Sequence, residues 1–499
     1  MVVEFNTPEW VKDAVFYQIF PDRFASSERI VKPNNLEAWE APPTPHGFKG
    51  GDLLGIAEHL GYLSDLGITA IYLNPIFQSA SNHRYHTHDY YRVDPILGGE
   101  RAFRKLLREA HRRGMRVILD GVFNHASRGF FQFHHIMECG DKSPYIDWFE
   151  VQSYPVLAYP GSGGSVNYRC WADLPALPEF NTANPQVRDY LFGVARYWLE
   201  QGIDGWRLDV ASCIDDDSFW AEFRQIVKSA NPEAYIVGEI PTEAQRWLQG
   251  DQFDAVMNYQ FTQACLGFFA GDKIDRQLER GMMGLPETKI LNAHSFSRRV
   301  EELVEIYPRE AALAQLNLLD SHDMPRFLSL AGGDKSALRL ATLFQMTYPG
   351  APCIYYGDEI GMTGGADPGC RRSMLWGKGR VSGTPGRIAP HSSWDMDLRN
   401  YVKKCISLRQ SHPALRRGEF ISLLADGGVY AYLRRLEGDT CVIVLNSSSS
   451  SYALDIPIKD YIHEGSHLEN LIGGGVARVI GGKITRLALP PRSGMVFSG

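Results

Sequence analysis

The segment GWRLDVAS, residues 205–212, places an arginine and an aspartate two positions apart in an otherwise apolar run. In an extended strand, alternate side chains share one face. Arg207 and Asp209 are therefore expected on the same side, opposite the apolar side chains. A neighbouring guanidinium lowers the pKa of an aspartate by roughly 1–3 units. We expect Asp209 to be ionised and able to act as a nucleophile.

A second carboxylate ends another apolar run. Glu239 closes the segment YIVGE, residues 235–239. Partial burial at that position would raise its pKa, which suits a general acid. One ionised and one protonated carboxyl group across a cleft is what glycoside hydrolysis requires. The pair therefore predicts that chemistry.

Polar residues also follow three further apolar runs. They are Asp120 with Asn124 and His125, His322 with Asp323, and Asp358 with Glu359. In a parallel barrel, catalytic groups come from the carboxyl ends of the strands. A structural salt bridge would explain any one of these residues. Five runs that all end this way predict one shared mouth.

The elements that must position these residues alternate along the chain. Predicted strands lie at 14–21, 69–76, 116–123, 205–210, 234–240, 255–259, 314–323 and 352–360. Predicted helices follow them, the clearest at 55–67, 100–114, 185–202, 217–230, 334–347 and 398–413. Eight strand–helix units predict an α/β fold, a closed TIM (β/α)8 barrel.

Two regions break the alternation. Residues 124–183 are rich in Gly, Pro, Ser and aromatic residues and show no clear period. A structureless loop of that length is unusual, which predicts an inserted subdomain after the third strand. Residues 414–499 alternate apolar residues with Gly and Asp turns, which predicts a C-terminal antiparallel β-sandwich domain. The barrel would then comprise 1–123 and 184–413.

Composition limits the partners and the compartment. The net charge of −7 argues against nucleic acid or an anionic membrane as a partner. No apolar run approaches the roughly 18–20 residues that span a bilayer, and the start MVVEFNTPEW does not look like a secretory signal. Eight cysteines without a CxxC pair indicate free thiols. We expect a cytoplasmic protein, and the sequence leaves its oligomeric state open.

Aromatic and histidine side chains follow the second predicted strand, in SNHRYHTHDYY, residues 81–91. Tyr85 could stack on a pyranose ring. His83, His86 and His88 could instead hold a metal, although their spacing is no recognised zinc pattern. The chain contains no Rossmann fingerprint, HExxH motif or nucleophile elbow. We therefore expect no required cofactor.

Four motifs identify a family. DGVFNH (120–125), GWRLDVAS (205–212), VGEI (237–240) and LLDSHD (318–323) resemble, in this order, the motifs of the α-amylase family of glycoside hydrolases. Three further segments resemble the neopullulanase, cyclomaltodextrinase and maltogenic amylase branch: residues 177–191, 250–259 and 355–372. The resemblance spans the whole chain. It implies a retaining mechanism through a covalent β-glycosyl-Asp intermediate.

The resemblance also implies a substrate and a role for each site residue. The substrate would be maltooligosaccharides, cleaved mainly at α-1,4 bonds, with cyclodextrins and pullulan as further candidates. Asp209 would be the nucleophile, Glu239 the acid/base, and Asp323 would hold ring hydroxyls. The same glucose unit would be bound by Tyr85, His125, Arg207, His322, Asp367 and Arg371. The carboxyl groups of Asp209 and Glu239 would lie about 5–5.5 Å apart.

Three departures from the branch affect these expectations. The first predicted strand begins near residue 14, so we expect the N-terminal β domain of the branch to be absent. The family's calcium loop corresponds to ASSERIVKPNN (25–35), which has few carboxylates, although Gly50 and Asp52 resemble half of that site. A structural calcium is therefore left open. Cys213 and His86 stand where the branch usually has Glu and Asp.

Two other functions stay open at this point. A glucanotransferase or a trehalose-forming isomerase would share the covalent intermediate and differ only in the access of water. A non-catalytic binding protein could keep the barrel, but it would be expected to lose catalytic carboxylates or to carry a membrane span.

Overall fold

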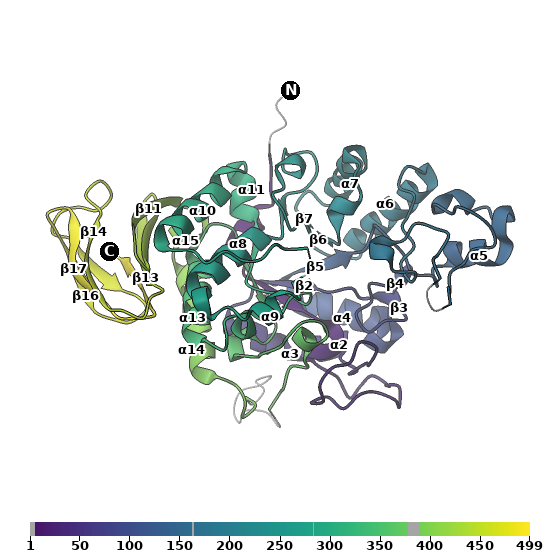
Figure 1. The fold of residues 1–499 in the computed structure, drawn as a ribbon, viewed down its shortest axis with the longest axis horizontal. Helices are drawn as coiled ribbons and strands as arrows, with labels where there is room; N and C mark the ends of the chain where they lie inside the picture. Colours follow the sequence, from purple (N-terminus) through teal and green to yellow (C-terminus); the bar gives the residue numbers. More distant parts are fainter. Residues whose placement is uncertain (1–4, 162–163, 283, 378–389) are drawn as a thin grey trace.

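The computed structural model describes residues 5–161, 164–282, 284–377 and 390–499. Eight parallel strands form one sheet in the order β8-β7-β6-β5-β2-β1-β10-β9 (Figure 1). Their bounds are β1 Phe16–Ile19, β2 Ala70–Leu73, β5 Arg116–Gly121, β6 Gly205–Leu208, β7 Tyr235–Gly238, β8 Ala255–Val256, β9 Leu316–Leu318 and β10 Ala351–Tyr355. Met257, just after β8, pairs in parallel with Leu316 of β9 and closes the sheet. The predicted TIM barrel is confirmed.

Helices surround this barrel (Figure 1). The main ones are α3 Leu53–Leu66, α4 Gly99–His111, α6 Pro185–Glu200, α7 Asp217–Ala230, α8 Tyr259–Cys265, α10 Ala293–Glu305, α13 Lys335–Thr347 and α14 Met396–Ser411. Several begin at an Asp or Asn whose side chain accepts a hydrogen bond from a backbone amide of the first turn. Asn184, Asp216 and Asp334 do this for α6, α7 and α13. Between β7 and β8 the described chain forms only a 3-10 turn, Gln245–Trp247.

Strand β6 shows the two-sided pattern predicted for GWRLDVAS. Trp206 is fully buried and packs on Phe123 with ring centroids 5.4 Å apart. The next residue, Arg207, is also fully buried but contacts Asp120 and Asp209. The strand therefore sends an apolar ring to one side and a guanidinium to the other.

The segment after β2 contains a small sheet that periodicity did not predict. Strands β3 (Phe77–Ser79) and β4 (Thr87–Val93) pair antiparallel. Their register shifts twice, so the side chains do not follow a simple alternation that a sequence pattern would reveal. The connection between the two strands carries Tyr85.

The described part of the region 124–183 contains the helix α5 (Phe131–Cys139) and three 3-10 turns, joined by irregular chain. One isolated bridge joins its two ends, His125 with Glu179, and another joins its middle to its end, Phe149 with Phe180. In Figure 1 it lies at the opposite end of the molecule from the C-terminal sheet.

The C-terminal strands form an antiparallel sheet that folds around its own core. Their bounds are β11 Glu419–Asp426, β12 Val429–Leu436, β13 Asp439–Asn446, β14 Tyr452–Pro457, β15 His467–Asn470, β16 Val476–Ile480, β17 Lys483–Leu489 and β18 Ser493–Ser498. On β12, Val429, Ala431 and Leu433 face this core. The alternate residue Arg434 donates to the carbonyl of Thr347 at the end of α13. The predicted C-terminal antiparallel β domain is confirmed.

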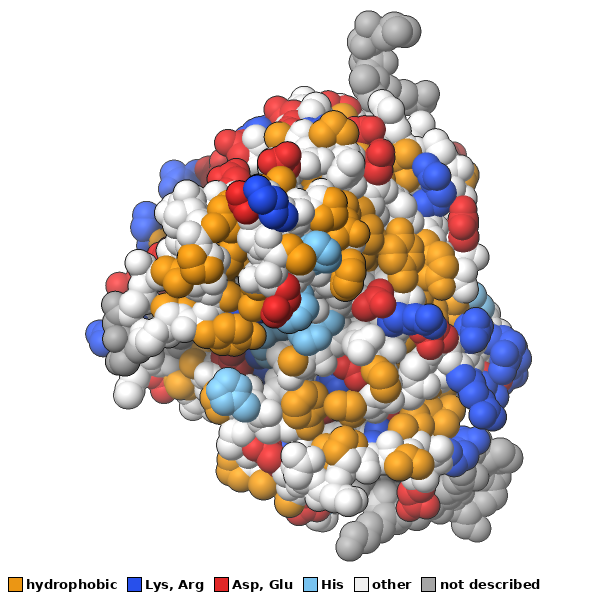
Figure 2. All heavy atoms as spheres, turned by 90° about the vertical axis from the view of Figure 1, so that its right-hand side faces the viewer, with side chains coloured by type: hydrophobic (Ala, Val, Ile, Leu, Met, Phe, Trp, Pro, Cys, Tyr) orange, Lys and Arg blue, Asp and Glu red, His pale blue; other side chains and the backbone are white. Residues whose placement is uncertain are grey.

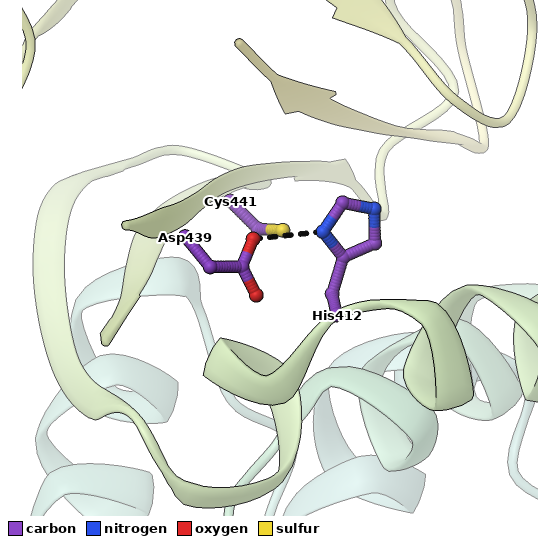
Figure 3. A group of neighbouring side chains, drawn as sticks. All are labelled: His412, Asp439 and Cys441. Atoms are coloured by element: carbon purple, nitrogen blue, oxygen red, sulfur yellow. Dashed lines mark hydrogen bonds and ion pairs between the residues drawn. The ribbon is translucent and has the colours of Figure 1, made fainter. Parts of the chain in front are cut away.

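His412, Asp439 and Cys441 lie where the barrel meets this sheet (Figure 3). Their potential ligand atoms lie within 4.8 Å of one another. However, one oxygen of Asp439 is hydrogen-bonded to His412 Nδ1 and the other accepts from the Ala414 amide, each at 2.8 Å. The group therefore joins the start of α15 (Pro413–Arg417) to β13.

Two further observations concern the helices and the cysteines. Within the described ranges, every helix is too short or too polar to cross a membrane. All eight cysteines are free, five of them buried. The expected free thiols are therefore present in the fold.

Candidate active site

Arg207 is the centre of a group of acidic side chains at the carboxyl ends of β5, β6 and β7. Its Nη1 donates to Asp120 Oδ1 and to Asp209 Oδ1, each at 2.8 Å. Its Nη2 lies 2.8 Å from Glu239 Oε1. The guanidinium is fully buried, whereas Asp209 and Glu239 keep 8 % and 14 % of their side chains exposed. One cation thus contacts one fully buried carboxyl group, that of Asp120, and two that reach the edge of solvent.

Glu239 is held by two further donors. Its Oε2 accepts a hydrogen bond from the amide of Val210 at 2.9 Å, and its Oε1 accepts one from the hydroxyl of Tyr259 at 3.2 Å. Val210 adopts φ 39 and ψ 44, a left-handed conformation that is strained for a β-branched residue. The strained turn after β6 thus places the amide of Val210, the residue next to Asp209, where it donates to the carboxylate of Glu239. Sequence reasoning missed both Val210 and Tyr259, although Tyr259 ends the predicted strand AVMNY.

The predicted lowering of the Asp209 pKa is wrong. Burial raises the pKa of Asp209 well above its ordinary value. The guanidinium of Arg207 opposes this rise, but the negative charges of Glu239 and Asp120 add to it. Burial also raises the pKa of Asp120. One guanidinium does not neutralise three carboxylates, so the group binds a proton more readily than isolated carboxyl groups would.

Asp323 belongs to a second group beside the first. It lies 3.0 Å from His322 Nε2 and 3.0 Å from Arg371 Nη2. The other terminal nitrogen of Arg371 lies 3.1 Å from Asp367 Oδ1, and its Nε donates to the carbonyl of His322 at 2.8 Å. Asp323 and Asp367 are 37 % and 51 % exposed, whereas Arg371 is nearly buried. The guanidinium thus fixes two accessible carboxylates.

Tyr85 connects the two groups. Its hydroxyl donates to Asp120 Oδ2 at 2.8 Å and lies 2.6 Å from His322 Nε2. Its ring stacks on the imidazole of His322, with centroids 5.4 Å apart and an interplanar angle of 6°. Tyr72, which sequence reasoning missed, donates to the same Asp120 oxygen at 2.7 Å. The structure therefore brings Asp209, Glu239 and Asp323 into one connected hydrogen-bonded network.

His125 lies next to this network with one nitrogen unused. The ring is buried, and its Nε2 has no hydrogen-bond partner among the described residues. Burial lowers its pKa to about 3, so the ring is neutral near neutral pH. The indole of Trp171, from the 124–183 region, stacks on it at 5.5 Å. Trp171 was not singled out in the sequence, where it stands among the Gly and Pro of that region.

The face of the molecule that carries this region has a mixed character. Figure 2 shows histidine side chains gathered near its centre, among apolar and acidic side chains. Pockets for organic ligands combine apolar and aromatic walls with a few oriented polar groups. Cys213 also borders the site. Its thiol interacts with Trp171, and burial and the negative charges of Asp209 and Glu239 raise its pKa.

The acidic residues after β10 do not join this site, which corrects the expectation of five contributing strands. Glu359 is fully buried and accepts hydrogen bonds from the hydroxyls of Tyr17 and Tyr62. Asp358 pairs with Arg326. Asp358 and Glu359 do follow a barrel strand, as predicted. However, the packing partners of a side chain at the end of a strand decide the direction in which it points.

Gly50 and Asp52 also lie in a different place, and they do not fit a calcium site. Asp52 Oδ1 accepts from the amide of Gly55, and Oδ2 accepts from the amide of Ser27. The ammonium of Lys32 lies 2.8 Å from the same Oδ2 and also donates to a backbone carbonyl. Calcium requires six to eight oxygen ligands, whereas this carboxylate already faces a cation and two amides.

The alternative metal site at His83, His86 and His88 is not supported. The rings of His83 and His86 meet edge to face at 4.9 Å. In the ranges that the structure describes, the group at His412 is the one in which three potential ligand atoms lie within 4.8 Å of one another. Burial lowers the pKa of His86 to about 4.

Two family descriptions match the chain. Residues 18–418 match "Alpha amylase, catalytic domain" and residues 420–496 match "Maltogenic Amylase, C-terminal domain". The first match covers well over half of the chain. The protein therefore belongs to the α-amylase family of glycoside hydrolases, as the sequence motifs predicted.

Individual relatives agree with the predicted branch. A cyclomaltodextrinase of a Bacillus species is 44 % identical over 90 % of this chain and 75 % of its own length. The solved structure of Ttha1563 from Thermus thermophilus has 47 % identity and a TM-score of 0.91, with 98 % of this chain and 99 % of that chain covered. A debranching enzyme of Nostoc punctiforme has 44 % identity and a TM-score of 0.86, with 99 % and 100 % covered. Further relatives are named neopullulanase and maltogenic amylase.

Proposed function

We propose that this protein hydrolyses α-glucosidic bonds, mainly α-1,4 bonds of maltooligosaccharides, with retention of configuration at the anomeric carbon. Asp209 is the nucleophile and forms a covalent β-glycosyl ester. Glu239 protonates the leaving oxygen and then deprotonates the attacking water. The observation that carries this proposal is the contact of both carboxyl groups with one buried guanidinium, Arg207.

The charge of this group supports the proton transfer. Asp120, Asp209 and Glu239 together exceed the charge of Arg207, which favours one retained proton. We assign that proton to Glu239 when substrate is bound, because the resemblance makes this residue the acid. Arg207 and the amide of Val210 then stabilise the carboxylate of Glu239 after the proton has left.

Asp323 and its neighbours hold the glucose unit whose bond is cleaved. The carboxylate of Asp323 is accessible and is fixed by Arg371 and His322, so it can accept hydrogen bonds from two vicinal ring hydroxyls. The unused nitrogen of His125 offers one more hydrogen bond. Tyr85 and Asp367 complete the same subsite. The approach of about 5–5.5 Å between the Asp209 and Glu239 carboxyl groups remains a prediction.

The retaining mechanism can be tested directly. The anomer formed first from maltotriose is followed by proton NMR during the first minutes of the reaction, before mutarotation mixes the signals. We expect the α-anomer. First formation of the β-anomer would show inversion and exclude the covalent intermediate.

Cyclodextrins, pullulan and α-1,6 bonds are proposed as further substrates. The names of similar proteins support this range, since they include cyclomaltodextrinase, neopullulanase and debranching enzyme. Product profiles from maltotriose, β-cyclodextrin, pullulan and panose separate these activities. An enzyme that cleaves maltotriose alone would restrict the proposal to linear α-1,4 substrates.

Glycosyl transfer is the second candidate activity. It uses the same ester and depends on which acceptor reaches it. Cys213 borders the site at a position where the branch usually has Glu, and this substitution favours a changed acceptor preference. At high maltose concentration, longer or re-linked glucosides would indicate transfer, whereas glucose alone would indicate hydrolysis.

We also propose a cytoplasmic location and no required cofactor. The free cysteines support the location, and one relative is named intracellular maltogenic amylase. The contact of Lys32 with Asp52 supports a fold that holds together without calcium.

A further inference from the structure

A second group of acidic side chains lies behind the loop that carries His322 and Asp323. This loop joins β9 to α12 (Phe327–Leu330). Asp320 stands at its start and Arg326 at its end, and both are buried. Asp358 follows β10 and keeps 13 % of its side chain exposed.

Asp358 contacts both ends of this loop. It accepts a hydrogen bond from Arg326 Nη1 at 2.7 Å, and its carboxyl group lies within hydrogen-bonding reach of that of Asp320. Asp320 Oδ2 in turn accepts from the amide of Phe327 at 2.6 Å, which draws the ends of the loop together. A single carboxyl group from the turn after β10 thus contacts both ends of the loop.

A hydrogen bond between two carboxyl groups requires a proton. With both groups ionised, Asp320 Oδ1 has no donor among the described residues. An unsatisfied buried acceptor costs about 1–3 kcal/mol, and two buried carboxylates against one guanidinium leave an uncompensated charge.

We propose that Asp358 is protonated and donates this proton to Asp320 Oδ1, and that it thereby acts as a positioning residue for the loop bearing His322 and Asp323. The charges then balance, with Arg326 positive, Asp320 negative and Asp358 neutral. The positioning role rests on the proposed function of Asp323. The protonation itself does not depend on any catalytic assignment.

The surroundings of the pair favour the proton. The titratable groups that face it are Arg326, Cys353, Tyr355, Tyr356 and Glu359. Arg326 lies over the ring of Tyr355 at 4.4 Å, so its charge is shared with an aromatic face. Glu359 adds a negative charge nearby. Burial and the charge of Asp320 raise the pKa of Asp358 well above its ordinary value.

Infrared spectroscopy tests the proton. The full-length enzyme is compared with D358N and with D209N near neutral pH, in the region of the carbonyl stretch of a protonated carboxylic acid. We expect a band in the wild-type enzyme and in D209N that D358N lacks. Identical bands in the wild-type enzyme and D358N would overturn the proposal.

Activity tests the positioning role. D358N keeps a donor toward Asp320 and an acceptor for Arg326, whereas D358L fills similar space with neither. We expect kcat/KM on maltotriose to stay near the wild-type value in D358N and to fall about 10–100-fold in D358L, because the loop loses its register. If D358L does not fold, D320N replaces it: its amide can donate to an ionised Asp358, so near wild-type activity is expected. Loss of activity in D358N as large as in D358L would refute the role.

The pH dependence of stability gives a third readout. A carboxyl group whose pKa is raised by folding contributes stability below its unfolded pKa and loses it as pH rises through the folded value. The wild-type Tm should therefore fall relative to that of D358N as pH increases above about 4. A constant difference would contradict the shared proton. A failed hydrolysis assay with an intact infrared band would instead refute the proposed function alone.

Discussion

Arg207 at the barrel mouth contacts three carboxyl groups, whereas Asp52 at the start of α3 meets one ammonium and two backbone amides. Both sets of residues are largely buried. In the first, acidic groups outnumber the cation, and the pKa of Asp209 is raised. In the second, the ammonium of Lys32 balances the charge of the Asp52 carboxylate. An excess of carboxyl groups near solvent raises their pKa values, so they can bind and release protons in catalysis. A balanced ion pair contributes only to the stability of the fold.

The largest expected effect concerns the unbalanced site. D209N keeps the shape of the side chain but removes the nucleophile, so kcat on maltotriose should fall on the order of 10⁴-fold or more, with the Tm nearly unchanged. The measurement is the initial rate of maltotriose hydrolysis together with thermal unfolding. D215N, at an exposed residue outside the network, is the matched control. Wild-type activity in D209N would exclude the nucleophile assignment.

Removal of the shared cation should disturb both stability and activity. R207M leaves three carboxyl groups without their guanidinium, which should cost about 3–5 kcal/mol of unfolding free energy. Because the remaining carboxyl pKa values rise in the folded state, the deficit should grow with pH and be larger at about pH 8 than at about pH 5.

Thermal unfolding at the two pH values measures this effect. R246M is the control, because Arg246 forms exposed ion pairs with Asp215 and Asp217, and such pairs contribute little. A deficit for R207M that is independent of pH would indicate lost packing rather than uncompensated charge.

The acid limb of the activity profile should reflect the raised pKa of Asp209. A protonated nucleophile is inactive, so kcat/KM should fall about tenfold per pH unit below that pKa, with a midpoint above the ordinary aspartate value of about 3.9. The imidazole of His125, with a pKa of about 3, stays neutral through this range. Rates of maltotriose hydrolysis across pH provide the test, and a midpoint at or below the ordinary value would contradict it.

The balanced region should respond more weakly. K32M removes the ammonium from Asp52 but leaves two amide donors, so we expect a loss of about 2 kcal/mol. Denaturant unfolding measures it, with K142M at an exposed lysine as the control. A neutral effect would mean that the amides alone satisfy Asp52.

The smallest expected effect is that of a chelator. Because Lys32 faces the carboxylate of Asp52, EDTA should leave the Tm of the wild-type enzyme unchanged, and added calcium should not raise it. A chelator-sensitive Tm would show that the fold holds calcium elsewhere or displaces Lys32.

The local pattern of apolar residues was sufficient to predict the strands and helices of the barrel. Helix α7 begins and ends at the predicted bounds, Asp217 and Ala230, and the structure shows that the side chain of Asp216 caps its first turn. Seven barrel strands lie inside a predicted apolar run, and β10 begins one residue before its run, at Ala351. The runs are longer than the strands. The paired strands β3 and β4 escaped prediction because their irregular register hides the alternation of side chains.

Within the site, sequence motifs placed the three carboxylates and Arg207 but not their environment. Val210 and Tyr259 act on Glu239 from residues 29 and 20 positions away in the chain. The error on the pKa of Asp209 has the same origin, since its burial and the charges of Glu239 and Asp120 that raise this pKa arise from neighbouring strands. Asp358 and Glu359 were expected at the mouth of the barrel because they follow β10. They do follow that strand, but their partners, Arg326 and Tyr17, lie outside the site.

The sequence by itself determined where along the chain the barrel strands and helices lie, because the pattern of apolar residues is encoded locally. It also determined the family, because the four motifs occur in order. Only the tertiary structure decided how many charges surround each carboxyl group. Electrostatic energies depend on distances between strands that are far apart in the chain, and these distances exist only once the barrel has closed.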